Sequence, residues 1–227
     1  MLLEDKNTTK EVLELINRFN NSSPETGLLF LSVLAEQKNG FDLSHVIRVQ
    51  EIARRVAEVL TLPDAEIIGK AAACHDVGKL GIPKELLQLD RELLKWEFDV
   101  IKRHPVLGAE IIEGISTVVK RQNKFLQYAR EIALWHHEKC DGTGYPHGLT
   151  SKEIPIHVKI TTVVDIFDAL TSWRPYKFPW DVNAALTYLE ENAEKFDADV
   201  LKAFKEVVND ILKETEKTLV TTHAHLK

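Results

Sequence analysis

Cysteine is scarce in this sequence, and long apolar runs are missing. The 227 residues include two cysteines, Cys74 and Cys140, which stand far apart and do not make a disulfide framework. We expect both to be reduced thiols rather than metal ligands. No apolar run approaches the roughly 20 residues that span a bilayer, and the N-terminus lacks the basic start and apolar core of a signal peptide. A cytoplasmic protein with no membrane partner is therefore expected.

An excess of positive charge is missing too. Lys and Arg number 29 against 35 Asp and Glu, and the formal net charge is −6. This balance gives no overall attraction to a nucleic-acid polymer or to an anionic membrane. A nucleotide ligand would therefore need a local basic patch.

The alternation of apolar and polar residues that is typical of strands never continues long enough to predict one. Apolar residues recur instead at helical spacing. Helices are predicted after Thr8 and over residues 25–38, 42–60 (with Asp42 as N-cap), 65–75, 92–103, 106–113, 123–137, 156–170, 181–189 and 198–208. We predict an all-α protein with an N-terminal helical extension at residues 1–40, a main domain at 41–217 and a flexible tail at 218–227.

The most distinctive stretch ends one of these helices with two adjacent imidazoles. It reads His136-His137-Glu138-Lys139-Cys140-Asp141-Gly142-Thr143-Gly144-Tyr145-Pro146. Neighbouring side chains on a helix point about 100° apart. Both histidines can therefore face one site only if that site lies at the helix end, before the Gly/Pro turn.

Five of the nine histidines lie at helix ends or beside apolar residues, and two aspartates share this setting. They are His45, His75, His104, His136 and His137, with Asp76 and Asp165. One such histidine alone is commonly a core or capping residue. Together the seven groups are best satisfied by divalent metal ions, because an unpaired buried carboxylate costs on the order of several kcal/mol. Imidazole and carboxylate suit Fe, Mn, Co, Ni or Zn, and seven ligands predict two ions rather than one.

The order of these residues resembles a known family. His45, His75-Asp76 and Asp165 resemble the signature of the HD phosphohydrolase superfamily. Residues 104–109, 136–146 and 165–172 resemble the HD-GYP subfamily, and the match covers residues 42–205. The resemblance implies a helical bundle of the HD-domain type, here with two extra N-terminal helices. It also implies a bacterial signal-transduction hydrolase that cleaves cyclic di-GMP to pGpG or on to GMP.

The resemblance assigns the ligands to two ions, Fe or Mn first, with Ni, Co or Zn as further options. One ion would take His45, His75, Asp76 and Asp165, and the other would share Asp76 and take His104, His136 and His137. A hydroxide bridging the ions is the implied nucleophile. Lys79 would offset charge on the phosphoryl oxygens or protonate the leaving 3′-oxygen.

The resemblance also implies substrate contacts. Arg174 and Lys177 match basic residues that bind phosphate, and they would supply the local positive patch. Gly144 and Tyr145 are expected to line the guanine or ribose side of the cleft. An equally weighted alternative is that this turn only holds His136 and His137.

Three features depart from the subfamily pattern. Phe41 stands where some members carry a glutamate that supports a third metal ion, so two ions are favoured and Asp42 is interpreted as a helix cap. Trp173 replaces a common acidic residue. No sensor or receiver domain is recognisable, so regulation is expected through residues 1–40 or through a partner such as a diguanylate cyclase or sensor protein. A homodimer is left open.

Two alternative functions are left open by the sequence. One is a catalytically weak cyclic-dinucleotide receptor or docking module, against which the complete set of seven ligands argues. The other is an HD hydrolase of another cyclic dinucleotide, since Arg174 and Lys177 favour a phosphate-rich ligand without selecting its base.

Overall fold

The computed structural model describes residues 23–39, 44–119, 122–173 and 178–224. Several predictions concern residues outside these ranges. They are the helix after Thr8, the roles of Phe41 and Asp42, and the phosphate contacts of Arg174 and Lys177. All of these stay predictions.

The part of the chain that the structure describes is helical and contains no strand. Its elements are α2 (Pro24–Asn39), α3 (Ser44–Val59), α4 (Ala65–Ala72), the 3-10 helix η1 (Val77–Gly81), α5 (Lys84–Leu87), α6 (Lys95–Ile101), α7 (His104–Val119), α8 (Lys124–Trp135), α9 (Ile156–Thr171), α10 (Val182–Glu191), the 3-10 helix η2 (Ala193–Lys195) and α11 (Ala198–Ala224). An isolated bridge joins Asp141 and Thr150. The predicted all-α class is confirmed.

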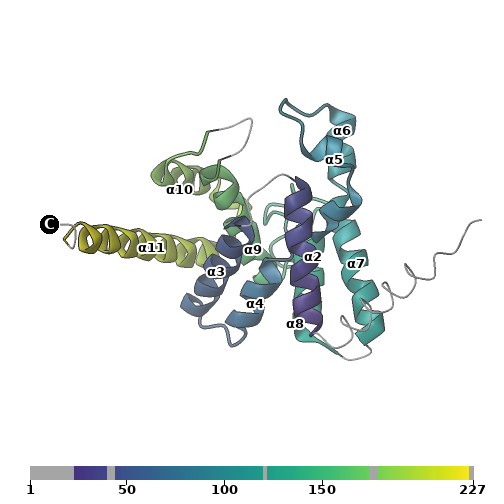
Figure 1. The fold of residues 1–227 in the computed structure, drawn as a ribbon, viewed down its shortest axis with the longest axis horizontal. Helices are drawn as coiled ribbons and strands as arrows, with labels where there is room; N and C mark the ends of the chain where they lie inside the picture. The colour runs from purple at the N-terminus through teal and green to yellow at the C-terminus, as the bar shows by residue number, and fades with distance from the viewer. Residues whose placement is uncertain (1–22, 40–43, 120–121, 174–177, 225–227) are drawn as a thin grey trace, which may run out of the picture.

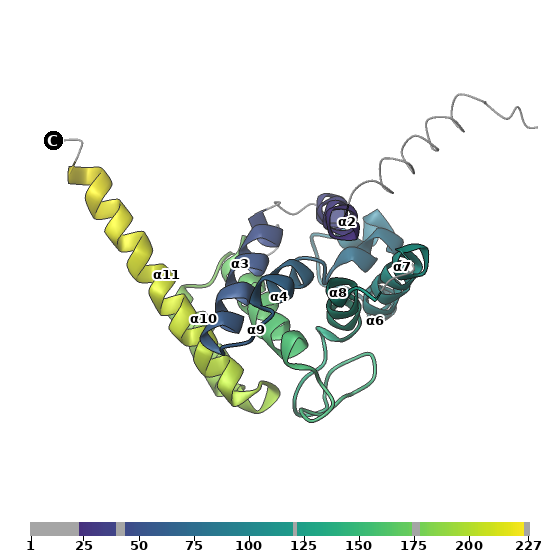
Figure 2. The same ribbon diagram turned by 90° about the horizontal axis from the view of Figure 1, so that it is seen from below.

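The hydrophobic core forms where α3, α4, α8 and α9 meet. Its fully buried side chains include Val49, Val56, Ala71, Ile132 and Val164. Helix α7 packs against α8, and α11 packs against α3 and α9 before its C-terminal part projects away from the other helices (Figures 1 and 2). None of the described helices combines the length and the apolar character needed to cross a membrane.

The start of helix α7 differs from the prediction. A helix was expected to stop at His104-Pro105 and a short one to cover residues 106–113, but α7 begins at His104 and continues to Val119. Proline is tolerated in the first turn of a helix, because its missing N–H would have no intrahelical acceptor there. Pro105 therefore starts α7, and His104 becomes its first residue.

Other boundaries also differ from the prediction; α6 covers only Lys95–Ile101, and α8 ends at Trp135 rather than at residue 137. Helix α4 ends at Ala72, so His75 lies in the turn that follows rather than in the helix predicted over residues 65–75. Helix α11 runs to Ala224, so the backbone of most of the predicted tail at residues 218–227 is helical. Its flexibility stays a prediction.

Helix α2 joins the same core as the main domain. Leu28 is fully buried within that core, and α2 packs against η1. The Lys38 ammonium donates a hydrogen bond to the Leu80 carbonyl over 2.6 Å. The domain boundary predicted at residue 40 remains a prediction, but this helix lies against the element that follows His75 and Asp76.

Gly78 lets η1 approach the first turn of α7. A Cβ added to Gly78 would lie 1.9 Å from the His104 carbonyl oxygen and 2.4 Å from the Gly108 nitrogen. Both neighbours are backbone atoms and cannot turn aside. The absence of a side chain at Gly78 therefore brings the Asp76 end of η1 next to His104.

Candidate metal centre

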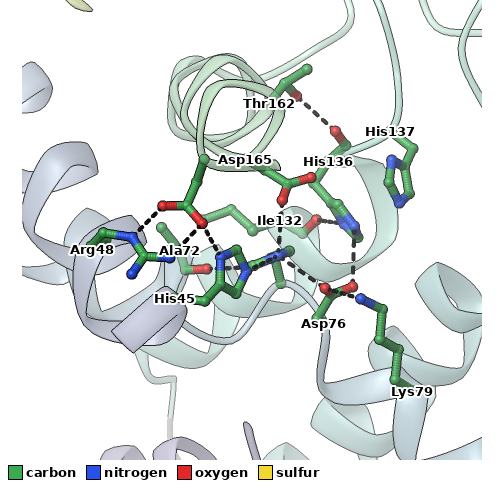
Figure 3. A network of polar contacts seen from close by, with 12 residues as sticks. His45, Arg48, Ala72, Asp76, Lys79, Ile132, His136, His137, Thr162 and Asp165 are labelled. Carbon is green, nitrogen blue, oxygen red and sulfur yellow. Dashed lines mark hydrogen bonds and ion pairs between the residues drawn. The ribbon is translucent and has the colours of Figure 1, made fainter. Parts of the chain in front are cut away.

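Seven predicted ligands come together from five parts of the fold. His45 lies in the first turn of α3, His104 begins α7, His136 and His137 directly follow α8, and Asp165 lies in α9. His75 and Asp76 occupy the turn between α4 and η1. Figure 3 shows Asp76 beside Lys79 and facing His136. Within each of two sets of three, the ligand atoms lie within 4.8 Å of one another; the sets are His45, His75 and Asp76, and His104, His136 and His137.

Three of the histidines are held by backbone carbonyl groups. The Nδ1 atoms of His75, His104 and His136 lie 2.9, 2.7 and 3.0 Å from the carbonyl oxygens of Ala72, Ile101 and Ile132 respectively. A carbonyl oxygen can only accept, so each Nδ1 carries the proton and donates it. In the neutral ring this arrangement leaves the Nε2 lone pair for a metal ion, as in many metal-bound histidines.

The Nε2 atoms face one another at short range. The distances are 3.4 Å between His45 and His75, 3.3 Å between His104 and His136, and 3.2 Å between His104 and His137. Two nitrogens bound about 2.1 Å from one ion at a tetrahedral angle are about 3.4 Å apart. The donor atoms are therefore both chemically and spatially suited to divalent metal ions.

Asp76 lies between the two histidine sets. Its Oδ1 is 3.2 Å from His104 Nε2 and 3.8 Å from His136 Nε2. Its Oδ2 is 3.2 Å from His75 Nε2 and also accepts from the Lys79 ammonium. Each oxygen thus faces a different set, which is the arrangement that a bridging carboxylate requires.

Asp165 approaches the first set from α9. Its Oδ1 lies 3.5 Å from His75 Nε2. Burial acts to lower the pKa of His75, but Asp76 and Asp165 raise it well above its usual value. Burial likewise acts to raise the pKa of Asp165, and the bond with His75 holds it below its usual range. A proton on His75 Nε2 and a metal ion would therefore compete for one lone pair between two carboxylates.

His136 and His137 are neutral at physiological pH. Burial, together with the neighbouring His75 and His104, lowers the pKa of His136 to about 3. Burial is also the main reason that the pKa of His137 falls well below its usual value. The His136 carbonyl accepts from the Thr162 hydroxyl over 2.9 Å, which ties the end of α8 to α9.

Asp168 is a functional residue that the sequence analysis did not assign. It is 3% exposed, and its Oδ2 accepts from His45 Nδ1 over 2.7 Å. The Arg48 guanidinium donates to both of its oxygens, over 2.5 and 3.0 Å (Figure 3). Asp168 therefore orients His45 as the backbone carbonyls orient the other histidines. Its position one helical turn after Asp165 was the available signal.

Gly144 and Tyr145 make close structural contacts in the turn after His137. A Cβ on Gly144 would lie 2.4 Å from Glu138 Cα, so only glycine fits there. The Tyr145 ring stacks on the His137 ring, with centroids 4.6 Å apart and an interplanar angle of 23°. The Lys102 ammonium lies 4.6 Å from the centroid of the Tyr145 ring. Substrate contact by Gly144 and Tyr145 stays a prediction.

Glu138 holds this loop and was also missed. The side chain is 1% exposed, and its two oxygens accept from the backbone N–H groups of His147 and Leu149 over 2.6 and 2.9 Å. The carboxylate therefore folds the loop back onto the end of α8, directly behind the two adjacent histidines. Its place immediately after His136 and His137 was the signal in the sequence.

The sequence is similar to those of known proteins. The sequence matches the family described as HD domain over residues 30–200. The cyclic di-GMP phosphodiesterase response regulator RpfG of Xanthomonas campestris is 41% identical over 182 residues, and the match covers 79% of this chain and 46% of that protein. The 3′3′-cGAMP-specific phosphodiesterase 2 of Vibrio cholerae is 35% identical over 183 residues, with coverages of 79% and 31%. The chain spans less than half the length of either relative.

A solved structure has a similar arrangement of helices. Bd1817, an HDG"Y"P protein from Bdellovibrio bacteriovorus, superposes with a TM-score of 0.57 at 22% identity. The match covers 74% of this chain and 51% of that one. At this identity the likeness concerns the fold alone, and it confirms the predicted bundle of the HD-domain type.

Proposed function

This chain belongs to the HD domain family, and on that premise we propose that it is a metal-dependent phosphodiesterase that hydrolyses cyclic di-GMP. The observation that carries the proposal is the place of Asp76, whose two oxygens face two separate histidine sets. The substrate is supported by the Xanthomonas relative, which is named as a cyclic di-GMP phosphodiesterase and is 41% identical. The family resemblance and the donor set point to the same chemistry.

Two divalent ions would be held by the seven predicted ligands. His45, His75, Asp76 and Asp165 would hold one, and Asp76, His104, His136 and His137 the other. The family resemblance favours Fe or Mn, with Ni, Co or Zn as alternatives, and a mixed set of imidazoles and carboxylates is compatible with these metals. When bound, such ions polarise phosphoryl oxygens and make water a better nucleophile at neutral pH.

The chain's own groups supply orientation and a proton. Hydrogen bonds at Nδ1 orient the imidazole rings of His45, His75, His104 and His136. The Lys79 ammonium, which pairs with Asp76, would offset charge on the phosphoryl oxygens or give its proton to the leaving 3′-oxygen. Cleavage of one phosphodiester yields pGpG, and cleavage of both yields GMP.

Substrate recognition would fall to residues around this centre. Arg174 and Lys177 would bind phosphate, and Gly144 and Tyr145 would line the base or ribose side. Burial raises the pKa of Tyr145, so its phenol stays protonated and can donate a hydrogen bond. A diguanylate cyclase or sensor protein as partner, and a homodimer, remain proposals of the same kind.

Turnover with defined metals tests the function. Protein purified anaerobically is loaded with Mn²⁺ or Fe²⁺ and incubated with cyclic di-GMP, and the products are separated by chromatography. We expect pGpG or GMP from the wild type and at least a hundredfold loss in Asp76→Ala. Asp210→Asn, which alters an exposed aspartate paired with Lys213, should retain full activity. Equal rates in Asp76→Ala and wild type would refute the assignment.

A second substrate has support from one relative. The Vibrio cholerae protein, 35% identical to this chain, is named as specific for 3′3′-cGAMP. Competition between cyclic di-GMP and 3′3′-cGAMP, measured as the ratio of kcat/KM values, distinguishes the two. A ratio well above one for cyclic di-GMP supports the first assignment, and the reverse supports the second.

A further inference from the structure

Glu36 is a buried carboxylate with no evident partner. It lies in α2 and is 2% exposed. Neither carboxylate oxygen has a hydrogen-bond partner among the residues that the structure describes. Buried charges are normally paired, because water no longer solvates them. A carboxylate in this position therefore calls for a cation.

The nearest part of the centre to this helix is η1, the element that carries Lys79. Helix α2 packs against η1, and the Lys38 ammonium, two residues after Glu36, reaches the carbonyl of Leu80. The Lys79 side chain is 15% exposed and pairs with Asp76. Glu36 therefore lies in the helix that packs against the element carrying Lys79.

The bridging position of Asp76 creates a conflict for Lys79. Asp76 Oδ2 faces both His75 Nε2 and the Lys79 ammonium. An ion bound at this oxygen withdraws its electron density and brings positive charge beside the ammonium, which weakens the Asp76–Lys79 pair. Lys79 then needs another acceptor to stay at the edge of the centre.

We infer that Glu36 is a positioning residue, which takes over the Lys79 ammonium when metal ions engage Asp76 and holds it toward the substrate phosphate. An ammonium has three N–H donors, so it can change from one carboxylate to another without leaving the site. Helix α2 thereby becomes part of the catalytic apparatus. The inference rests on the proposed function only through the metal ions and the role of Lys79.

A melting series tests the pairing without any substrate. Wild type, Glu36→Gln, Lys79→Met and the double variant are melted with saturating Mn²⁺ and after its removal. With Mn²⁺, Lys79→Met leaves Glu36 buried and unpaired, and we expect its Tm to fall by roughly 6–12 °C. Adding Glu36→Gln removes that charge, so the double variant should melt at least 3 °C above Lys79→Met. Without Mn²⁺, Glu36→Gln should lower the Tm less in the background that keeps Lys79, because Asp76 still pairs with the ammonium there.

Several results would overturn the inference. If Glu36→Gln changes the Tm equally in the wild-type and Lys79→Met backgrounds, Glu36 is protonated or serves another group. In the background that keeps Lys79, an equal effect of Glu36→Gln on the Tm with and without Mn²⁺ would overturn the exchange between carboxylates. Glu25→Gln is the matched control, since it makes the same chemical change in the first turn of α2, about 16 Å along the helix, and should leave the pattern unchanged.

Kinetics gives a second measurement in case Lys79→Met does not fold. With Mn²⁺ and cyclic di-GMP, Glu36→Gln should lower kcat about tenfold and change KM less than twofold, because the lysine is misplaced for the chemical step. Unchanged kcat, or a loss confined to KM, would overturn the positioning role. If the wild type hydrolyses no cyclic di-GMP, the proposed function fails while the melting series still decides the pairing.

Discussion

Replacement of Asp168 by asparagine is the sharpest test of how the centre is supported. The Asp168 carboxylate supports the predicted ligand His45, whose Nδ1 lies 2.7 Å from Oδ2. Asparagine keeps the size of the side chain but loses its charge. The substitution should therefore weaken the orientation of His45 and the pairing with Arg48 while leaving the seven ligands in the chain.

The size of the stability effect follows from the pKa of Asp168. Burial acts to raise this pKa, but hydrogen bonds with His45 and Arg48 bring it from 3.8 to about 2. That difference corresponds to about 2 kcal/mol at neutral pH. In a domain of this size, about 2 kcal/mol lowers the Tm by roughly 4–8 °C.

The pH dependence has a definite sign. A carboxylate with a lowered folded-state pKa stabilises the protein above its unfolded pKa, and this contribution is lost as pH falls through the folded value. The stability difference between metal-free wild type and Asp168→Asn should thus be complete above about pH 4 and should shrink toward pH 2. Denaturant titrations at a series of pH values measure it.

Metal affinity provides the second readout. Loss of a residue that orients a metal-bound histidine typically weakens metal affinity by about 10–100-fold. Competition with a chromogenic chelator should show one weakened Mn²⁺ site and one of nearly normal affinity, because His45 belongs to one set. Asp210→Asn serves as the control. Two unchanged affinities alongside a lowered Tm would refute the orienting role of Asp168.

Three further perturbations have expected outcomes. Gly78→Ala should cost about 1–3 kcal/mol of stability and lower activity at least tenfold, since its Cβ would overlap the His104 carbonyl; wild-type melting and turnover would contradict this. Glu138→Gln should lose about 1.5–3 kcal/mol and speed proteolysis within residues 139–149, and an unchanged cleavage pattern would count against it. Removal of bound metal by a chelator should lower the Tm by roughly 5–10 °C, because a ligand at 100 times its Kd adds about 2.7 kcal/mol to the free energy of unfolding. An unchanged Tm would argue against metal in the native protein.

The sequence was sufficient to single out seven candidate ligands, because the chemistry of each is local. Histidine and aspartate at helix ends can be recognised one by one, and their order matched a family pattern. The structure brings all seven together. The helical class was equally accessible, because the spacing of apolar residues is a property of each segment alone.

The supporting residues were harder to predict because their partners lie far away in the chain. Asp168 meets Arg48 across 120 positions, where α9 packs against α3. The role of Gly78 depends on the packing of α7 against η1, and the role inferred for Glu36 depends on the packing of α2 against η1. The start of α7 was wrong for another reason: Pro105 is unfavourable inside a helix but favourable in its first turn.

The carbonyl groups that accept hydrogen bonds from the histidines also place partial negative charge around the centre. Ala72, Ile101 and Ile132 lie in the last turns of α4, α6 and α8, so three helix C-termini converge on the cluster. Each C-terminus carries about half a negative charge from the aligned peptide dipoles. Two divalent ions, as proposed, would bring four positive charges against two from the aspartates, and the helix ends would offset about 1.5 of the remaining two. The rest would be available to an anionic phosphodiester, so the arrangement of the helices agrees with the proposed cations and with the proposed substrate.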